Sequence, residues 1–481
     1  MPAASYPDRL FINGRMEPGR GLLIEVENPT TGAVFAAFAG ADAGQLEAAV
    51  AAASAAFMRP EWQVAGTRAT LLTRLADLMA RDADYLGQLL IDEVGTPRAL
   101  LAPLQVGGAV QILRYYAGLA TRDLTRALGP DGHPLIPSES EIRYLPAGVA
   151  GIITAYNYPL LLLALKLGPA MAAGCTAVVM PSALTPLATL HVAALAAEAG
   201  FPAGTVNIIV GAPEIAQALT LHPLVDRISF TGSVNVGRMV MRQAAEGLKG
   251  VTLELGGKSA AIVLPGADLS AVTLPIHTRY MRNAGQGCAS PTRILVQRNR
   301  MSEFLEITRN SVGTLKLGDP NESDTVIGPL ITRAHRERVA GYVRRAVDAG
   351  ARIICGGGPV AGREGWFFEP TVLADLDNTF EIAREELFGP VGVVLPYDSL
   401  DEAIAIANDS PLGLAAHVYG PVAEARAIAP RLRVGSVYIN GGGGLRMEAP
   451  MGGFKQSGIG REYGVEGLME YLEPQHIQWP L

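Results

Sequence analysis

A cysteine preceded by two closely spaced glycines is the first residue whose surroundings suit chemistry. Cys288 ends the segment Asn-Ala-Gly-Gln-Gly-Cys, in which Gly285 and Gly287 leave the backbone free to adopt unusual angles and let a ligand approach closely. An accessible thiol there would be a nucleophile. A buried structural cysteine is the alternative, since free thiols are among the most buried side chains. Cys175 and Cys355 adjoin apolar strands, and we expect both to be structural.

Glu254 lies between two leucines in a predicted strand that ends in the pair Gly256 and Gly257. Such a carboxylate either faces solvent or occupies a pocket, where burial would raise its pKa toward the range of a general base. The stretch from Glu254 to Cys288 leaves room for one strand and one helix. A base and a nucleophile on neighbouring strand ends would suit acyl transfer.

Two further segments follow predicted strands. Asn157 lies just past a strand end, where its side-chain amide could donate to a developing oxyanion, although an Asn before a turn proline is also a common turn residue. The segment 230–237, Phe-Thr-Gly-Ser-Val-Asn-Val-Gly, opens a helix whose first amides would suit a phosphate. It lacks the GxGxxG dinucleotide pattern, and Ser233 could be an ordinary helix cap. The seven histidines show no metal-binding spacing, so we expect no catalytic metal.

An alternation of short apolar strands and helices must position these residues. We expect strands at 149–154, 177–180, 206–210 and 227–230, separated by helices at 159–173, 186–199, 213–221 and 233–246. Further strands are expected at 260–264, 292–297, 351–354, 391–395 and 434–439. Continuous apolar strands joined by helices predict parallel sheets covered on both faces, and therefore an α/β fold with two α/β units in tandem. Residues 42–121 have helical periodicity, and 123–145 predicts a hairpin that stands apart.

The composition excludes several classes of function. Of 481 residues, 49% are apolar and 18% are charged, which is not the composition of a disordered chain. The net charge of −7 comes without a basic cluster, so we expect no nucleic-acid partner, and no apolar run is long enough to span a membrane. Three scattered cysteines indicate a reducing compartment, and the N-terminus does not resemble a signal peptide, so a cytoplasmic protein is expected. Small molecules are the expected partners.

Seven segments, in order and over essentially the whole chain, resemble the NAD(P)-dependent aldehyde dehydrogenase superfamily. They begin at Pro146, Tyr156, Phe230, Glu254, Gly285, Glu385 and Pro450, and they spell PAGV, YNYP, FTGS, ELGGK, GQGC, EELFGPV and PMGGFKQSG. The resemblance implies a Rossmann-like dinucleotide domain, a second α/β catalytic domain and a small β-hairpin/tail oligomerisation arm.

The resemblance also implies the roles of the site residues. Cys288 would attack the aldehyde, Asn157 and the Cys288 backbone N–H would hold the oxyanion, and Glu254 would activate the water that hydrolyses the thioester to a carboxylic acid. Lys166 matches a lysine placed near the asparagine. Glu386 would hold the nicotinamide ribose, with Phe388 beside it. The other cofactor-binding positions implied are Thr154, Ala155, Tyr156, Met180, Ser182, Ala183, Gly211, Phe230, Thr231, Gly232, Ser233, Gly237, Leu255 and Gly256.

One segment departs from the family pattern. Where the family commonly has Lys-Pro-Ser-Glu, the charged residues gripping the adenosine ribose, this chain has Met180-Pro-Ser-Ala183. Loss of the glutamate removes the repulsion that excludes a 2′-phosphate, while loss of the lysine removes that phosphate's counter-charge. The cofactor is therefore NAD or NADP, with NAD favoured.

The positions that match the family's substrate channel are apolar. Tyr158, Leu162, Leu165 and Met451 favour an aliphatic or aromatic aldehyde. Arg446, after the four glycines, could instead anchor a carboxylate, although a solvated loop arginine is favoured.

The expected domain boundaries follow from the same resemblance. Residues 1–125 and 147–255 would form the dinucleotide-binding domain, 256–456 the catalytic domain, and 126–146 with 457–481 the oligomerisation arm. Such an arm exposes strand edges that need a partner, so we expect a homodimer or homotetramer. A rival hypothesis is a thiol esterase on a dehydrogenase-like scaffold with impaired cofactor binding, and a third is a purely structural protein.

Overall fold

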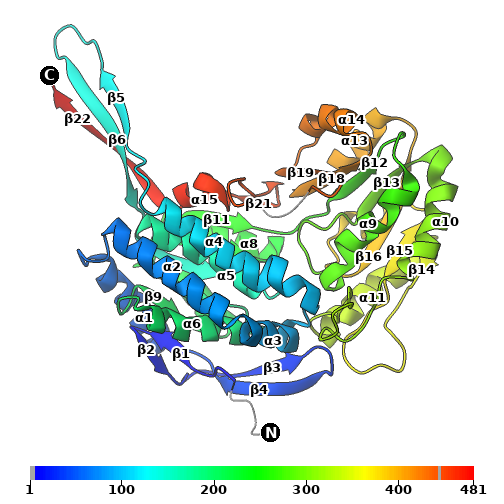
Figure 1. Ribbon diagram of the computed structural model, residues 1–481, viewed down its shortest axis with the longest axis horizontal. Helices are drawn as coiled ribbons and strands as arrows, with labels where there is room; N and C mark the ends of the chain where they lie inside the picture. The colour runs from blue at the N-terminus through cyan, green and yellow to red at the C-terminus, as the bar shows by residue number, and fades with distance from the viewer. Residues whose placement is uncertain (1–5, 443–445) are drawn as a thin grey trace.

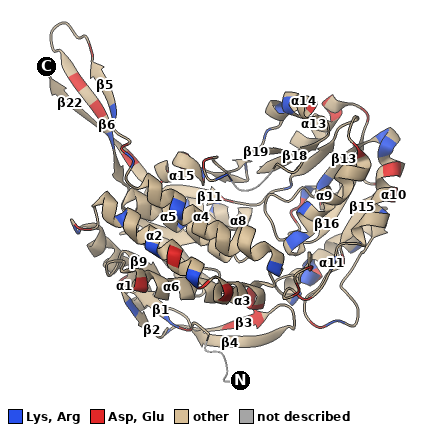
Figure 2. Cartoon of the chain, viewed as in Figure 1, with Lys and Arg blue, Asp and Glu red and all other residues tan. Residues whose placement is uncertain are grey.

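The computed structural model describes residues 6–442 and 446–481. It shows two α/β layers side by side and a narrow arm that projects from one of them (Figure 1). The predicted α/β fold is confirmed. Acidic and basic residues alternate along the helices in this view, without a long run of either sign (Figure 2).

The first large sheet is built around five parallel strands. In spatial order its strands are β2 (Arg15–Glu17), β1 (Leu10–Ile12), β9 (Val206–Ile208), β8 (Thr176–Met180), β7 (Val149–Ile153), β10 (Arg227–Thr231), β11 (Gly250–Glu254) and β21 (Gly458–Ile459). The run from β9 to β11 is parallel, and β1 and β21 flank it antiparallel. Every residue of β8 is buried, as expected for a parallel strand covered on both faces.

The second large sheet carries the rest of the alternation. In spatial order its strands are β14 (Arg352–Cys355), β15 (Thr371–Ala374), β16 (Val391–Tyr397), β13 (Arg293–Gln297), β12 (Ala260–Val263), β18 (Ala415–Tyr419) and β19 (Ser436–Ile439). Only the β14–β15 pair is antiparallel among these described strands. Two short pairs complete the large layers: β3 (Leu23–Asn28) with β4 (Ala33–Ala39), and β17 (Leu412–Gly413) with β20 (Phe454–Lys455).

Helices cover both sheets and enclose two separate hydrophobic cores. The first layer holds α1 (Ala43–Phe57), α2 (Ala65–Arg81), α3 (Ala83–Val94), α4 (Val106–Leu119), α5 (Pro159–Ala173), α6 (Leu187–Ala199), α7 (Pro213–Leu221), α8 (Val234–Glu246) and α15 (Gly464–Met469). The second holds α9 (Leu269–Met281), α10 (Met301–Val312), α11 (Arg333–Asp348), α12 (Glu381–Arg384), α13 (Leu400–Asn408) and α14 (Val422–Ile428). Apart from Lys166, helix α5 is apolar on every side, and it is buried almost throughout because α4, α6 and the sheet pack around it.

The arm is a three-stranded antiparallel sheet. Strands β5 (Arg126–Pro130) and β6 (Ser138–Pro146) form the predicted hairpin, and β22 (Leu472–Pro480) pairs along the whole of β6. Of the rest of the C-terminal segment, β21 pairs with β11 and α15 packs on α5. The chain therefore returns to the first layer before it enters the arm (Figure 1).

The structure also contains strands that the sequence pattern did not predict. Four lie between residues 10 and 39, and β15 and β18 extend the second sheet. The expected strand at 206–210 ends at Ile208, and the strand expected at 351–354 runs antiparallel.

Candidate active site

Three neighbouring strands of the first sheet end at one edge, and their ends build one wall of a cavity. Strands β7, β10 and β11 lie side by side, with Phe230 opposite Ile153 and Thr231 opposite Glu254. The carboxyl ends of parallel strands are the usual ligand site of such sheets. A cavity of about 940 Å³ lies there, and its wall also includes segments of the second layer.

Most of the predicted site residues line this cavity. They are Thr154, Ala155, Tyr156, Asn157, Ser182, Phe230, Thr231, Gly232, Ser233, Glu254, Leu255, Gly256, Cys288, Glu386 and Phe388. Residues separated by more than 200 positions in the sequence are thereby brought together.

Five predicted residues are not part of the lining. Lys166 is buried in α5 behind it, Met180 is buried at the end of β8, and Ala183 is partly buried against the first core. Gly211 is buried after β9. Gly237 lies in α8, where a Cβ would stand 2.5 Å from Leu255 Cδ2, so its contribution is close packing of α8 on the strand end.

The loop that carries Cys288 precedes β13 and contains three consecutive residues in the left-handed region. Their φ angles are 53° at Asn283, 54° at Ala284 and 76° at Gly285. A Cβ on Gly285 would lie 2.1 Å from the carbonyl of Gly389, so this loop touches the backbone of the segment that bears Glu386. The expectation that Cys288 lies at a strand end is wrong. One strand and one helix do separate it from Glu254, but it enters from the second layer, before the first residue of β13.

The side chain of Gln286 holds this loop in place. Its Oε1 accepts a hydrogen bond of 3.0 Å from the Ile331 amide, and its Nε2 donates to the carbonyls of Asn283 and Pro329 at 3.2 and 3.4 Å. Because Gln286 is fully buried, these bonds fix the backbone two residues before the thiol.

Burial dominates the ionisation of Cys288. It raises the pKa of the thiol to about 12, and the charges of Glu254 and Glu386 act in the same direction. The thiol is therefore protonated at neutral pH until a base or a bound cation favours the thiolate. Burial likewise raises the pKa values of Cys175 and Cys355 to about 11.

Asn157 follows β7 and is positioned by its backbone. Its carbonyl accepts hydrogen bonds of 3.3 Å from Gln105 Nε2 and Asn283 Nδ2. Its own Nδ2 donates to the Gln286 carbonyl at 3.0 Å, so it is aimed at the Cys288 loop and its second N–H remains available. This is the placement that an oxyanion donor requires.

Glu254 is buried beside a second carboxylate that sequence reasoning missed. Burial, followed by the charge of Glu462, raises the pKa of Glu254 well above its usual range. Glu462 is itself paired with Lys166, whose Nζ lies 2.6 Å from Glu462 Oε1 and 3.1 Å from Ser229 Oγ. Glu254 Oε1 has no hydrogen-bond partner among the described residues. A buried carboxylate of raised pKa with a free oxygen has the properties of a general base.

A second group of lining residues fits a dinucleotide. Ser233 caps α8 by accepting from the Val236 amide at 3.4 Å, so the positive end of that helix faces the cavity. The buried hydroxyls of Thr154 and Thr231 have no partner among the described residues, although both residues line the cavity. These orphaned groups suit a polar ligand.

Glu386 lies against the glycine pair that follows Glu254. Its Oε1 accepts from the Gly257 amide at 3.0 Å, and a Cβ on Gly256 would collide with its Oε2 at 2.0 Å. Burial raises the pKa of Glu386 to about 7. Beside it, the ring of Phe388 packs edge-on against Tyr156.

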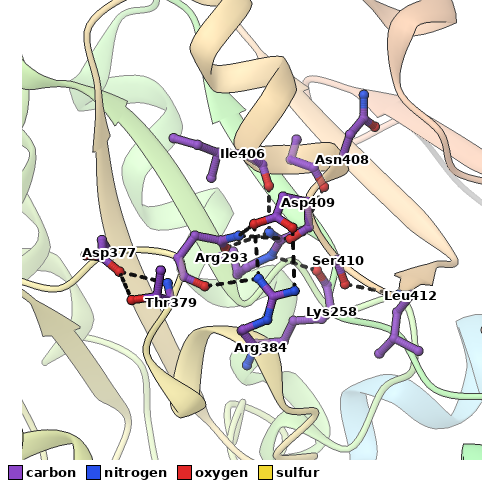
Figure 3. Close-up of polar contacts among 12 residues, drawn as sticks. Lys258, Arg293, Asp377, Thr379, Arg384, Ile406, Asn408, Asp409, Ser410 and Leu412 are labelled. Atoms are coloured by element: carbon purple, nitrogen blue, oxygen red, sulfur yellow. Dashed lines mark hydrogen bonds and ion pairs between the residues drawn. The ribbon is translucent and has the colours of Figure 1, made fainter.

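A buried arginine anchors the segments on either side of Glu386. Arg293 donates to the carbonyls of Lys258, Ile406 and Ala407 at 2.9–3.0 Å, and to Asn378 Oδ1 at 2.9 Å. Figure 3 shows its side chain between Lys258 and Ile406, with the ion pair of Arg384 and Asp409 next to it. These bonds connect the segment after Gly257 to the turn before Glu386.

The other end of the cavity is mainly apolar and aromatic. The predicted channel residues Tyr158, Leu162, Leu165 and Met451 all line it. Sequence reasoning missed four further lining residues there: Tyr438, Tyr463, Arg279 and Arg282. Arg446 is not in the lining, because its side chain is 80% exposed and lies 3.7 Å from Glu448.

The chain is similar to known proteins over most of its length. A sequence profile described as "Aldehyde dehydrogenase family" matches residues 17–477. The mitochondrial aldehyde dehydrogenase of Equus caballus is 38% identical over 456 residues, which cover 94% of this chain and 90% of the horse protein. Geranial dehydrogenase of Castellaniella defragrans is 41% identical over 431 residues, which cover 89% of each protein.

Solved structures of high similarity include complexes with a dinucleotide. An aldehyde dehydrogenase from Pseudomonas syringae, solved as a cysteine-to-alanine variant with NAD+ and octanal, is 39% identical with a TM-score of 0.93, covering 98% of this chain and 96% of that one. The NAD+ complex of aldehyde dehydrogenase from Bacillus cereus is 37% identical with a TM-score of 0.95, at the same coverage. Within the described residues, every helix is too short or too polar to cross a lipid bilayer.

Proposed function

This chain belongs to the aldehyde dehydrogenase family and is an NAD(P)-dependent enzyme that oxidises aldehydes, and we propose that Cys288, Glu254 and Asn157 perform the chemistry. The observation that carries the assignment is their convergence from three separate segments on one cavity, with a buried carboxylate of raised pKa beside the thiol. The thiol esterase alternative is not favoured, because the family match and the dinucleotide complexes of similar structures support cofactor-dependent oxidation.

The first step is attack of the Cys288 sulfur on the aldehyde carbonyl. Because the thiol is protonated at neutral pH, its proton must be released to solvent water as the sulfur attacks. The carbonyl oxygen becomes negative as the carbon–sulfur bond forms. Asn157 Nδ2 and the Cys288 backbone N–H donate to that oxygen, which stabilises the thiohemiacetal.

The second step is hydrolysis of the thioester left on Cys288. Glu254 takes a proton from water, which adds to the thioester carbon and releases the carboxylic acid and the thiol. Lys166 and Glu462 form an ion pair behind Glu254. The charge of Lys166 lowers the pKa of Glu254, but the charge of Glu462 opposes this effect, so Glu254 can still take up a proton. Lys166 is thus a positioning residue.

The dinucleotide is expected against the ends of β7, β8 and β10. When bound, it would supply the acceptor for the hydride that leaves the thiohemiacetal carbon. The N-terminus of α8 at Ser233 would face the pyrophosphate, and Thr154, Ser182 and Phe230 would flank it. Glu386 would accept from the nicotinamide ribose, since its carboxylate is already oriented by the Gly257 amide. Met180 and Ala183 offer no charge to the other ribose, whereas Ser182 lines the cavity.

An aliphatic or aromatic aldehyde fits the apolar end of the cavity. Leu162, Leu165 and Met451 would surround the carbon chain, and the charge of Cys288 acts on the hydroxyls of Tyr158 and Tyr463. Relatives whose names or complexes include geranial and octanal support this choice.

We also propose the expected division of the chain and its assembly. Residues 1–125 and 147–255 would bind the dinucleotide, 256–456 would supply Cys288, and 126–146 with 457–481 would join subunits through the strands of these segments that form the arm, β5, β6 and β22. The two separate cores support the first division, and the projecting arm supports assembly into a dimer or tetramer. Three free thiols support a reducing, cytoplasmic location.

The test compares two cysteine variants. Cys288→Ala should abolish aldehyde-dependent reduction of NAD(P) while cofactor affinity is kept, because only the nucleophile is removed. The matched control, Cys355→Ala, should keep wild-type turnover, because this thiol lies in β14 away from the cavity. Substantial turnover by purified Cys288→Ala would refute the assignment.

A further inference from the structure

Two arginines at the substrate end of the cavity have no part in the mechanism above. Arg279 lies in the last turn of α9, and Arg282 follows that helix directly. The other three arginines of the lining are engaged: Arg238 with Gln456, Arg338 with the Leu387 carbonyl and Arg384 with Asp409. Within residues 6–442 and 446–481, neither the Arg279 nor the Arg282 side chain forms a hydrogen bond or an ion pair, and the backbone N–H of Arg282 donates to the Thr278 carbonyl.

Both arginines lie close to tyrosines of the substrate end of the cavity. Arg279 Cζ is 5.3 Å from the centre of the Tyr438 ring. The charges of Arg282, Cys288 and Arg279 all act on the hydroxyl of Tyr158, whose pKa is raised chiefly by burial. A Cβ on Gly287 would lie 3.8 Å from that hydroxyl, which places Tyr158 against the residue preceding Cys288.

Among the described residues, no acidic side chain is found to act on the charge of Arg279. The His417 ring is the nearby group on which both arginine charges act, and its Nε2 lies 3.4 Å from the Ala289 carbonyl. Burial lowers the pKa of His417 to about 3, so this ring is neutral and adds no charge. Burial lowers the pKa of Arg279, and the charge of Arg282 lowers it further. Two half-buried cations that repel each other and lack counter-charges are stabilised by a bound anion.

We propose that Arg279 and Arg282 bind a carboxylate at the end of the substrate remote from its aldehyde group. The substrate would then be an aliphatic or aromatic aldehyde acid, a narrower class that rests on the proposed role of Cys288. The planar guanidinium matches a carboxylate in a bidentate manner. A carboxylate is favoured over a phosphate because the pair lies at the C-terminal end of α9, whose partial negative charge opposes a dianion more than a monoanion.

The experiment compares pairs of aldehydes that differ only in charge. Glutaric semialdehyde is paired with 5-methylhexanal, and 4-formylbenzoate with 4-isopropylbenzaldehyde, since an isopropyl group has the shape of a carboxylate. The wild-type enzyme should prefer each acid by about tenfold or more in kcat/KM, as charge-assisted hydrogen bonds provide. Arg282→Gln and Arg279→Gln should each lower that preference by about tenfold, and Arg282→Lys should restore part of it. The matched control is Arg426→Gln, an exposed arginine on α14, which should leave the preference unchanged.

A binding measurement separates this proposal from the proposed function. Calorimetry would titrate 4-formylbenzoate into Cys288→Ala and into the same protein with Arg282→Gln. A loss of affinity of about tenfold in the second protein supports the carboxylate site. If the wild-type enzyme nevertheless turned over no aldehyde, the proposed function would fail while the carboxylate site would stand.

Two results would overturn the inference. The first is equal kcat/KM for acids and isosteres, unaffected by either arginine variant, while turnover itself remains intact. The second is an arginine-dependent preference for glyceraldehyde 3-phosphate over glyceraldehyde without one for the carboxylates, which would assign the pair to a phosphate.

Discussion

The charge beside Glu254 determines the pH at which this residue can act as a base. Burial and Glu462 both raise the pKa of Glu254, whereas Lys166 lowers it. Glu462→Gln removes a negative charge and leaves the positive charge of Lys166 unpaired, so both effects lower the pKa of Glu254. The acidic limb of the pH profile of kcat should therefore move to lower pH.

The measurement is steady-state turnover across the pH range for wild type and Glu462→Gln. The variant should also lose about 3–5 kcal/mol of stability, because it leaves Lys166 buried without its partner. If the acidic limb of the kcat profile stayed at the same pH in the variant, Glu462 would not influence the pKa of Glu254.

The end of β8 offers a test of cofactor choice. Ala183→Glu would place a carboxylate next to Ser182, where it should tighten NAD by about 1.5–3 kcal/mol if it accepts from the ribose hydroxyls. It should weaken NADP through repulsion of the 2′-phosphate. Calorimetric titration of both cofactors measures this, with Ala183→Gln as the uncharged control. An unchanged NAD/NADP preference would show that this strand end does not contact the ribose.

Residue types and their immediate neighbours explain which site residues the sequence could reveal. Cys288, which follows Gly285 and Gly287, and Glu254, which stands shortly before a glycine pair, each have a local signature. Glu462 has none, because its partner Lys166 is 296 positions away and the contact exists only once α5 and the C-terminal segment have packed. Arg279 and Arg282 look like ordinary helix-end residues, since the missing counter-charge is a property of the folded cavity.

At the scale of elements, the loop before β13 depends on a conformation that favours glycine. Gly285→Ala would put a Cβ 2.1 Å from the Gly389 carbonyl at a φ of 76°, so loop and neighbouring segment must separate. We expect a loss of stability of about 1–3 kcal/mol and a large fall in turnover. Thermal denaturation and kinetics measure both. Gly313→Ala is the control, because nothing lies within 4 Å of its Cβ position and its φ is −62°. Full activity in Gly285→Ala would contradict the role given to this loop.

The secondary structure was predictable where the hydrophobic pattern was strong. The strands from β7 to β11 are continuous apolar runs with helices between them, and their parallel pairing follows. Strand β18 was missed because Ala415, Ala416 and His417 are poor strand formers, and β12 and β19 on either side make it a strand. The short N-terminal strands β1 to β4 likewise depend on partners rather than on local pattern.

At the scale of the whole molecule, the arm predicts association. Its exposed apolar side chains include Leu135, Ile136 and Trp479, which are 85%, 68% and 40% exposed. Light scattering should therefore give a mass of two or four chains for the wild type. The double variant Leu135→Lys/Ile136→Lys should shift the mass toward one chain, whereas Met58→Lys, exposed at the end of α1, should not. An active wild-type monomer would show that the arm does not join subunits.

The most direct test of the chemistry uses Glu254→Gln in a single turnover. If Cys288 forms the thioester and Glu254 is needed to hydrolyse it, mixing this variant with NAD and aldehyde should give a burst of about one reduced cofactor per site, followed by slow turnover. Intact-mass and peptide analysis of the stalled enzyme should then find one acyl group on Cys288, with the mass of the aldehyde less two hydrogens. No burst, or an acyl group on Cys175 or Cys355, would contradict the assignment of nucleophile and base.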